Sequence, residues 1–339
     1  MIRVAVDAMG GDNAPLEIVK GGLLAAEERK DIRVILVGKE EVIRKIIREQ
    51  GKDENLVDIV NAGEVIETGE PPVLAIRKKK DSSIVVGMKL VKDGGADAFC
   101  SAGSSGAVLV GGQLIVGRIK GVERPPLAPL IPTEKGPALL IDCGANVDAR
   151  PSHLVQFAQM GSVYMENIVG IKNPRVGLVN IGVEEEKGNA LAKETFPLLK
   201  ACPGINFVGN VESREIPHGA ADVYVTEAFT GNVILKLYEG LAMTLLSNIK
   251  RGIYSSTRAK IGGLLIKPAL KKTLKTFDVN HYGGAPLLGL KGLVVKTHGT
   301  ADAEIVRNTI FQCVTFNEEQ INEKIKQCLF PEEEKNDGI

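Results

Sequence analysis

The chain of 339 residues has no tryptophan, only four histidines and no net charge. Because 42 basic residues balance 42 acidic ones, no overall charge attracts it to nucleic acid, and any preference for anions must arise locally. No histidine falls at metal-ligand spacing with another histidine, a cysteine or a carboxylate; the four are His153, His218, His281 and His298. The sequence therefore predicts no metal site and no nucleic-acid partner.

Nucleotide and hydrolase signatures are also missing. The chain contains no G-x-x-x-x-G-K-[ST] loop, no G-x-G-x-x-G after its first predicted strand and no G-x-S-x-G nucleophile elbow. We therefore predict no cofactor, and we favour small anions over nucleotides as ligands.

The five cysteines form no disulfide or zinc pattern. They are odd in number, widely spaced and without a C-x-x-C pair, which indicates reduced thiols and a cytoplasmic location. Residues 1–12 begin a strand and contain Asp7, so no signal peptide is expected. Cys143 is the only thiol in a candidate site turn. It is predicted to be a small buried hydrophobic residue, and the alternative is an acyl-enzyme nucleophile.

One uncharged stretch, residues 98–117, is long enough to span a membrane. It contains five glycines, three serines and a glutamine, and its small polar residues lie in the first half. This interrupted pattern predicts a buried strand, a turn and a buried helix rather than a membrane span.

Runs rich in Val, Ile and Leu alternate with stretches of helical periodicity, which is typical of βα units around a parallel sheet. Strands are expected near residues 2–7, 32–37, 56–60, 96–101, 138–142, 175–180, 205–210, 222–226 and 293–296. Helices are expected at residues 16–29, 40–50, 152–167, 189–200 and 303–326. The predicted fold is a three-layer α/β/α arrangement with a mostly parallel sheet.

No flexible linker divides the chain. Residues 1–327 are therefore predicted to form a single α/β catalytic domain or two interleaved lobes, and residues 328–339 a polar tail.

Residues 241–277 carry eight Lys or Arg and no Asp or Glu. Pro268 is expected to split this segment into two short helices. A basic amphipathic arm at 250–278 could lie on an anionic bilayer, or it could be a dimer arm or a surface helix that packs its leucines on the body. The residues that would contact a membrane are Leu264, Leu265, Ile266, Lys267 and Leu270.

Five glycine-rich turns fall where strands should end and helices begin. Glycine lets the backbone approach a ligand closely, and free N–H groups at a helix start favour phosphate. If the turns share one sheet edge, they would form a ligand crevice there. They lie at residues 7–12, 101–107, 142–148, 180–184 and 229–233.

Two polar side chains near these turns could take part in chemistry. Lys187 follows a predicted strand and could reach phosphate as a point charge, or it could pair with its acidic neighbours at 184–186. Asn232 is expected in the first turn of a long helix, where its amide could cap the helix or donate to a developing oxyanion.

The turns occur in a recognisable order: V-D-A-M-G-G-D at 6–12, S-A-G-x-x-G-A at 101–107, D-x-G-A-N-V-D at 142–148, F-T-G-N-V at 229–233 and Y-G-G-A at 282–285. With R-P-x-L-A-P at 124–129 and H-L-V-Q-F-A at 153–158, the chain resembles the bacterial acyl-carrier-protein:phosphate acyltransferases over residues 1–325. It departs from their pattern at Ser104, Ser105, Cys143 and the pair Glu227-Ala228.

This resemblance implies a fold similar to phosphotransacetylases and isocitrate-dehydrogenase-like proteins, a homodimer, and transfer of a long-chain acyl group from acyl carrier protein to inorganic phosphate. It also implies peripheral contact with an anionic membrane, where the product would reach the glycerol-phosphate acyltransferase that acts next in phospholipid synthesis. Lys187 and Asn232 match residues that are functional in that family.

We therefore expect Lys187, with the N–H groups of 103–107 and 231–233, to hold phosphate, and Asn232 or a neighbouring N–H to stabilise the tetrahedral oxygen. The other expected phosphate- or substrate-binding residues are Asp7, Gly10, Gly11, Ser101, Gly103, Ser104, Ser105, Gly106, Asp142, Asn146, Thr230 and Gly231. The alternatives are a short-chain phosphate acetyl- or butyryltransferase that uses coenzyme A thioesters, a nicotinamide-linked dehydrogenase, and a non-catalytic membrane-surface scaffold.

Overall fold

The structure is a computed structural model that describes residues 1–276 and 283–331, the side chains of residues 272–276 excepted. The last residues of the predicted arm, Tyr282 of the Y-G-G-A motif and the tail from residue 332 lie outside the described residues. The chain forms two compact units, each built from separate stretches. Unit 1 comprises Met1–Pro129, Gln159–Asn173 and Asn280–Ile339, and unit 2 comprises Leu130–Ala158 and Pro174–Val279.

Unit 1 is built on a six-stranded sheet of order β10-β11-β4-β1-β2-β3, in which only β10 runs antiparallel to its neighbour. Its elements are β1 (Ile2–Asp7), α1 (Leu16–Glu28), β2 (Ile32–Gly38), α2 (Glu40–Glu49), β3 (Asp58–Asn61), α3 (Pro72–Lys78), α4 (Ser83–Lys92), β4 (Ala98–Ser101), α5 (Ser105–Gly111), β10 (Ala285–Pro286), β11 (Leu293–Lys296), α10 (Ala303–Glu318) and α11 (Ile321–Leu329). Two π-helical segments, η2 (Gly112–Val116) and η3 (Met165–Val169), and the short 3-10 helix η1 (Glu54–Leu56) complete it.

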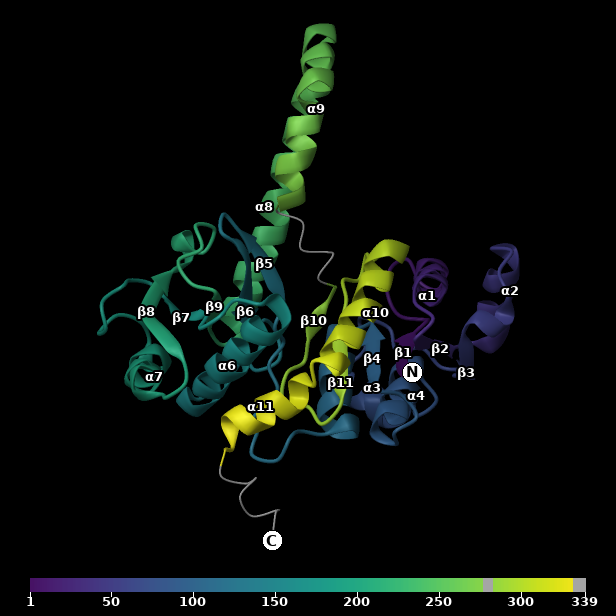
Figure 1. Cartoon of the computed structure of the whole chain (residues 1–339), viewed down its shortest axis with the longest axis horizontal. Helices are drawn as coiled ribbons and strands as arrows, with labels where there is room; N and C mark the ends of the chain where they lie inside the picture. The colour runs from purple at the N-terminus through teal and green to yellow at the C-terminus, as the bar shows by residue number, and fades with distance from the viewer. Residues whose placement is uncertain (277–282, 332–339) are drawn as a thin grey trace. The chain divides into compact units, whose positions relative to one another are not determined.

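The helices of unit 1 pack closely against the sheet and against each other because glycines, which have no side chain, lie at the contacts. Helices α1 and α10 lie against each other, and a Cβ at Gly21 would lie 2.5 Å from Cβ of Val306. Helix α4 packs against β1, β2 and β4, with Gly87 over the ring of Phe99. The central strand β1 is accordingly buried, as expected for parallel strands covered by helices (Figure 1).

Unit 2 is built on a five-stranded sheet of order β5-β6-β9-β7-β8, in which only β5 is antiparallel. Its elements are β5 (Leu130–Thr133), β6 (Gly136–Ile141), α6 (Pro151–Tyr164, in unit 2 up to Ala158), β7 (Arg175–Asn180), α7 (Ala190–Ala201), β8 (Asn206–Glu212), η4 (Ser213–Glu215), β9 (Val223–Val225), α8 (Ala228–Tyr254) and α9 (Thr257–Thr276). The beginning of α8 packs Ile234 onto a core that includes Leu140 and Tyr224.

Each of the nine expected strands is present, and β5 and β10 were not predicted. The strands divide between two mostly parallel sheets, one in each unit. Residues 98–117 form β4, a turn, α5 and η2, as expected. In the described part of the chain, no helix combines the length and the apolar character that crossing a membrane requires.

Two helix predictions were wrong. Helix α9 continues through Pro268, because the carbonyl that loses its donor belongs to Leu264, whose surroundings are open to solvent. The break comes instead between α8 and α9, where Ser256 caps α9 by accepting from the N–H of Ala259. The predicted helix at 303–326 is two helices, because Gln320 takes a left-handed conformation between α10 and α11.

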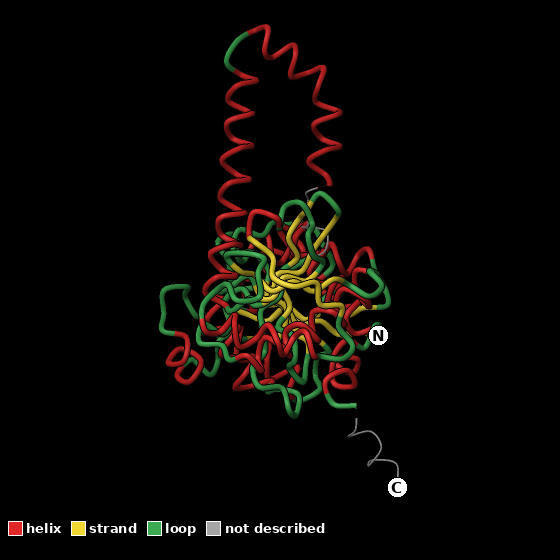
Figure 2. The backbone as a smooth tube through the Cα atoms, turned by 90° about the vertical axis from the view of Figure 1, so that its left-hand side faces the viewer, coloured by secondary structure: helices red, strands yellow, loops and turns green. Residues whose placement is uncertain are grey.

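Helices α8 and α9 form an antiparallel hairpin that extends away from the strands of its own unit (Figure 2). Much of its apolar surface is exposed, including Leu241, Met243 and Ile261. Of the predicted membrane-contacting residues, Leu264 is 77% exposed and Leu265 81%. Ile266 and Lys267 are also exposed and Leu270 is partly buried.

Candidate functional site

Three of the predicted turns lie at one edge of the sheet in unit 2. They follow β6, β9 and β7, which are neighbours in that order and run parallel. The turns at 142–148, 226–230 and 181–189 therefore lie side by side at the carboxyl ends of these strands, the edge where open α/β sheets bind ligands. The remaining two turns belong to unit 1, so the five do not share one edge.

Asp142 begins the first of these turns and organises its backbone. Its carboxylate is fully buried and accepts hydrogen bonds from the backbone N–H groups of Gly144 at 3.2 Å, Ala145 at 3.1 Å and Asn146 at 2.8 Å. The side-chain amide of Asn146 also donates to it at 2.7 Å. Both residues therefore shape the turn, and their direct contact with substrate stays a prediction.

The start of α8 is fixed by the second turn. Glu227 is the N-cap, and its carboxylate accepts from the N–H groups of Phe229 at 2.6 Å and Thr230 at 3.1 Å. The hydroxyl of Thr230 also donates to Glu227. The carbonyl of Asn146 accepts from the N–H of Ala228 at 3.1 Å, which ties the first turn to the helix. The glutamate that departs from the family pattern thus serves as a helix cap.

Asn232 consequently lies in the second turn of α8, not in the first, and it is not the cap. The N–H of Gly231 donates to the carbonyl of Glu227 at 3.0 Å, so the N–H groups of 231–233 belong to the helix and cannot hold phosphate. The side chain of Asn232 is exposed, and no described residue hydrogen-bonds to it. Its amide therefore remains available to a ligand.

Lys187 lies on the third turn with its side chain exposed. Its backbone is held by two hydrogen bonds: its N–H donates to the carbonyl of Glu184, and its carbonyl accepts from the amide of Asn180 at 3.0 Å. Among the described residues, no carboxylate lies within ion-pair distance of its ammonium group, and Glu185 pairs with Lys200 instead. The structure therefore does not show the alternative in which residues 184–186 pair with Lys187.

In unit 1, three turns follow the adjacent parallel strands β1, β4 and β11. They are joined by backbone hydrogen bonds: the N–H of Asp12 donates to the carbonyl of Gly299 at 2.7 Å, and the N–H of Thr297 to that of Ser101 at 3.0 Å. Gly11 takes a φ of 113°, which places the first turn against the third.

Asp7 connects two of these turns from inside. Its carboxylate is fully buried, accepts from the Ser101 hydroxyl at 2.6 Å and from the N–H of Met9 at 3.2 Å, and leaves no room for a side chain at Gly10. A Cβ there would lie 2.3 Å from Oδ2 of Asp7 and 2.7 Å from Cα of Gly103. Asp7, Gly10, Ser101 and Gly103 therefore hold the turns together, and their contact with phosphate stays a prediction.

The second turn ends with the buried Ser104, the exposed Ser105 and the partly buried Gly106. Ser104 is the N-cap of α5 and accepts from the N–H of Ala107 at 3.4 Å. The backbone N–H groups of Ser104, Ser105 and Gly106 have no acceptor among the described residues, and α5 continues directly into η2. These three groups suit a bound anion.

Burial raises the pKa of Asp7, although hydrogen bonds from Ser101, Ser83, Met9 and Gly10 oppose the shift. Because the folded pKa lies above the unfolded value of 3.8, the contribution of Asp7 to stability is complete below pH 3.8 and is lost as the pH rises through the folded pKa. We expect the free energy of unfolding of the wild type to fall relative to that of Asp7→Asn as the pH rises above 3.8 and through the raised pKa of the folded protein. Urea unfolding at several pH values measures this difference, and a constant difference would contradict the assignment.

Lys296 is a candidate that the sequence reasoning missed. It ends β11 with its side chain only 8% exposed, and its ammonium group donates to the carbonyl of Ala102 at 3.3 Å and to that of Thr297. It thus braces the Ser101–Gly106 turn. The signal was the K-T-H-G-T run at 296–300, which directly follows the predicted strand at 293–296.

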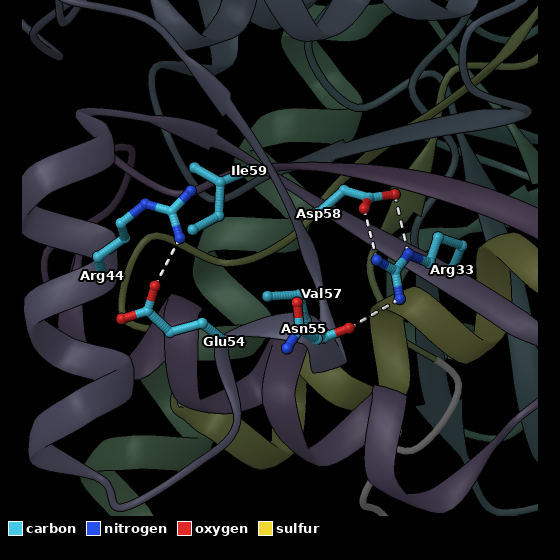
Figure 3. Close-up of a pocket in the computed structure, with 7 residues that line it drawn as sticks. All are labelled: Arg33, Arg44, Glu54, Asn55, Val57, Asp58 and Ile59. Carbon is cyan, nitrogen blue, oxygen red and sulfur yellow. Dashed lines mark hydrogen bonds and ion pairs between the residues drawn. The ribbon is translucent and has the colours of Figure 1, made fainter.

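Other features of the structure do not compete with these turns. A surface pocket around β3 contains Arg33 and Arg44, but these pair with Asp58 and Glu54 at 2.5 Å each, so no cation is left for a phosphate (Figure 3). No cluster of three or more His, Cys, Asp or Glu in the described segments could hold a metal ion.

Cys143 lies in the core of unit 2, where its thiol donates to the carbonyl of Leu140 at 3.4 Å. Burial, with the nearby charge of Asp142 adding to it, raises its pKa well above the usual range of a thiol. Such a thiol is not a nucleophile at neutral pH. The structure therefore agrees with the prediction of a buried hydrophobic residue.

Comparison with known proteins identifies the family. The family described as "Fatty acid synthesis protein" matches residues 2–324. The chain belongs to this family. It is 51% identical over 326 residues to a putative phosphate acyltransferase of Clostridium perfringens, covering 96% of each chain, and 48% identical over 328 residues to the phosphate acyltransferase of Clostridium tetani, covering 97% of this chain and 98% of the relative. The resemblance indicated by the motifs is confirmed, and family membership makes the chain an enzyme of the phosphate acyltransferase class.

Solved structures confirm the fold class. A phosphotransacetylase from Streptococcus pyogenes matches with a TM-score of 0.62 at 18% identity, covering 94% of each chain. One from Staphylococcus aureus matches with a TM-score of 0.59 at 16% identity and the same coverage. At such low identity the likeness concerns the α/β architecture alone.

Proposed function

We propose that the protein transfers a long-chain acyl group from acyl carrier protein to inorganic phosphate, and that the acyl phosphate enters phosphatidic acid and phospholipid synthesis. The observation that supports this most is Lys187, an ammonium group without an acidic partner among the described residues. It lies at the same sheet edge as the turn that places Asn232. One cation and one amide donor at the carboxyl ends of β7 and β9 suit a reaction that brings two anionic oxygens together.

The chemistry requires little acid–base help from the protein. A phosphate oxygen attacks the acyl carbon, the C–O bond forms, and collapse of the tetrahedral intermediate breaks the C–S bond and releases the carrier thiolate. We assign Lys187 to the phosphate and the amide of Asn232 to the developing oxyanion. No histidine is needed, because phosphate is already an anion and the thiolate is a good leaving group.

A substrate panel tests the acyl donor. We expect phosphate-dependent release of carrier thiol from palmitoyl-acyl carrier protein, with kcat/KM at least about tenfold above that for butyryl-coenzyme A. The opposite preference would assign the chain to the short-chain phosphate acyltransferases. Incubation without phosphate is the control for hydrolysis of the thioester.

We also propose that the α8–α9 hairpin contacts an anionic membrane surface in a cytoplasmic homodimer. The support comes from the exposed Leu264 and Leu265 beside the basic residues of α9, a combination typical of interfacial helices. Such contact would release the product near the glycerol-phosphate acyltransferase that consumes it.

The double change Leu264→Gln/Leu265→Gln should weaken binding to phosphatidylglycerol vesicles by about tenfold or more, because two exposed leucines no longer enter the bilayer interface. Turnover of soluble substrate should not change. Co-sedimentation measures binding, and Leu198→Gln/Val208→Gln, at exposed positions of α7 and β8, is the matched control. Unchanged vesicle binding with an altered oligomeric state would identify the hairpin as a dimer arm instead.

A further inference from the structure

Helix α3 lies directly beside the Ser101–Gly106 turn of unit 1. It packs against α5, and a Cβ at Gly106 would lie 2.5 Å from Cγ of Pro72, the first residue of α3. A molecule seated on α3 would therefore reach this turn without crossing the rest of the unit.

One face of α3 combines apolar and cationic groups. Val73 is 45% exposed and Leu74 52% exposed, and Arg77 and Lys78 follow them one turn later on the same face. The opposite face buries Ala75 and Ile76 in the core of the unit. The burial that stabilises α3 thus leaves Val73 and Leu74 about half exposed.

The cations of this face are not neutralised locally. In the described part of the chain, no carboxylate lies within ion-pair distance of Arg77, Lys78 or Lys80. The acidic groups nearby in sequence are engaged elsewhere: Glu70 pairs with Lys79 at 2.5 Å, Asp81 accepts from the N–H of Gly63 at 2.8 Å, and Glu64 accepts from the N–H of Asp81 at 3.1 Å.

We propose that this face of α3, formed by Val73, Leu74, Arg77 and Lys78, is the docking surface for the acidic protein that carries the acyl thioester. Two cations without an acidic partner complement an acidic protein and accelerate its approach, and two apolar side chains give the contact a short-range anchor. The inference rests on the proposed function, because it names the surface that binds the acyl donor of that reaction.

The test reverses two charges of the face. Arg77→Glu/Lys78→Glu should raise KM for acyl carrier protein thioester by about tenfold or more, because a like-charge contact replaces attraction. The kcat/KM for decanoyl-pantetheine, which lacks an acidic protein, should stay within about twofold. The control is Lys45→Glu/Arg48→Glu, two exposed cations of α2, a helix that packs against β2 and β3. The milder Arg77→Gln/Lys78→Gln guards against local unfolding.

Titration calorimetry with carrier protein that lacks the acyl group measures docking alone. It therefore separates this inference from the proposed reaction. Loss of carrier binding in the reversed variant, with binding kept in the α2 control, supports docking on α3 even if no acyl phosphate forms. Unchanged carrier binding and KM would overturn it. An equal loss of kcat/KM with carrier and pantetheine substrates would also overturn it, because the face would then belong to the site itself. Loss of vesicle binding alone would overturn it by assigning the face to the membrane.

Discussion

Replacement of Lys187 by alanine is expected to lower kcat/KM for phosphate by ~10²–10³ while leaving the fold intact. The ammonium group is exposed on the turn after β7 and has no acidic partner among the described residues, so its charge is available for a ligand. Its removal deletes the point charge that we assign to phosphate. Stability should hardly change, because the backbone bonds to Glu184 and Asn180 do not involve the side chain.

The measurement is steady-state turnover at varied phosphate concentration, with thermal unfolding as a check of the fold. Lys193→Ala is the matched control, because Lys193 is an exposed lysine in the first half of the following helix, α7. If Lys187→Ala turned over as fast as the control at every phosphate concentration, the assignment of phosphate to Lys187 would be lost. A companion change, Asn232→Ala, should lower kcat more than it raises KM for phosphate.

The change Gly231→Ala should destabilise unit 2 by about 3 kcal/mol or more and abolish activity. A Cβ at this position would lie 1.8 Å from the carbonyl oxygen of Asp142, which is backbone and cannot rotate away. The start of α8 would have to move off β6, and Asn232 would move with it. Urea unfolding and turnover measure the two effects.

Gly240→Ala is the internal control on the same helix. A Cβ at Gly240 has no described atom within 4 Å, so the substitution should raise the stability of α8 by about 0.5–1 kcal/mol through helix propensity alone. Similar behaviour of the two alanine variants would show that α8 does not approach Asp142 as the structure describes.

Much of the architecture could be predicted from the sequence because buried parallel strands are continuous runs of Val, Ile and Leu. The strands β1, β7 and β11 appear at the predicted residues for that reason. The division into two sheets could not be predicted, because strand order depends on contacts between distant residues and leaves no local pattern. The predicted break at Pro268 was wrong because proline removes only one hydrogen bond of the helix, and an exposed helix can tolerate that loss.

The candidate site was predicted in outline for a similar reason. Glycine-rich turns after strands identified the segments, but they did not show which polar groups face outward. The sequence predicts Asp7 and Asp142 as substrate-binding residues. In the structure both carboxylates are buried and hydrogen-bonded to residues of the turns. The sequence showed Glu227 only as a departure from the family pattern, and its bonds to the helix start identify it as the cap of α8. Lys296 was missed although the K-T-H-G-T run begins with it at the end of a predicted strand.

The most direct test of the central claim is a time course with purified protein, palmitoyl-acyl carrier protein and oxygen-18-labelled phosphate. Free carrier thiol is followed by absorbance and acyl phosphate by mass spectrometry. The account predicts that thiol release requires phosphate, and that each thiol is matched by one acyl phosphate retaining all the label. Thiol release without phosphate, or palmitate as the only product, would contradict it.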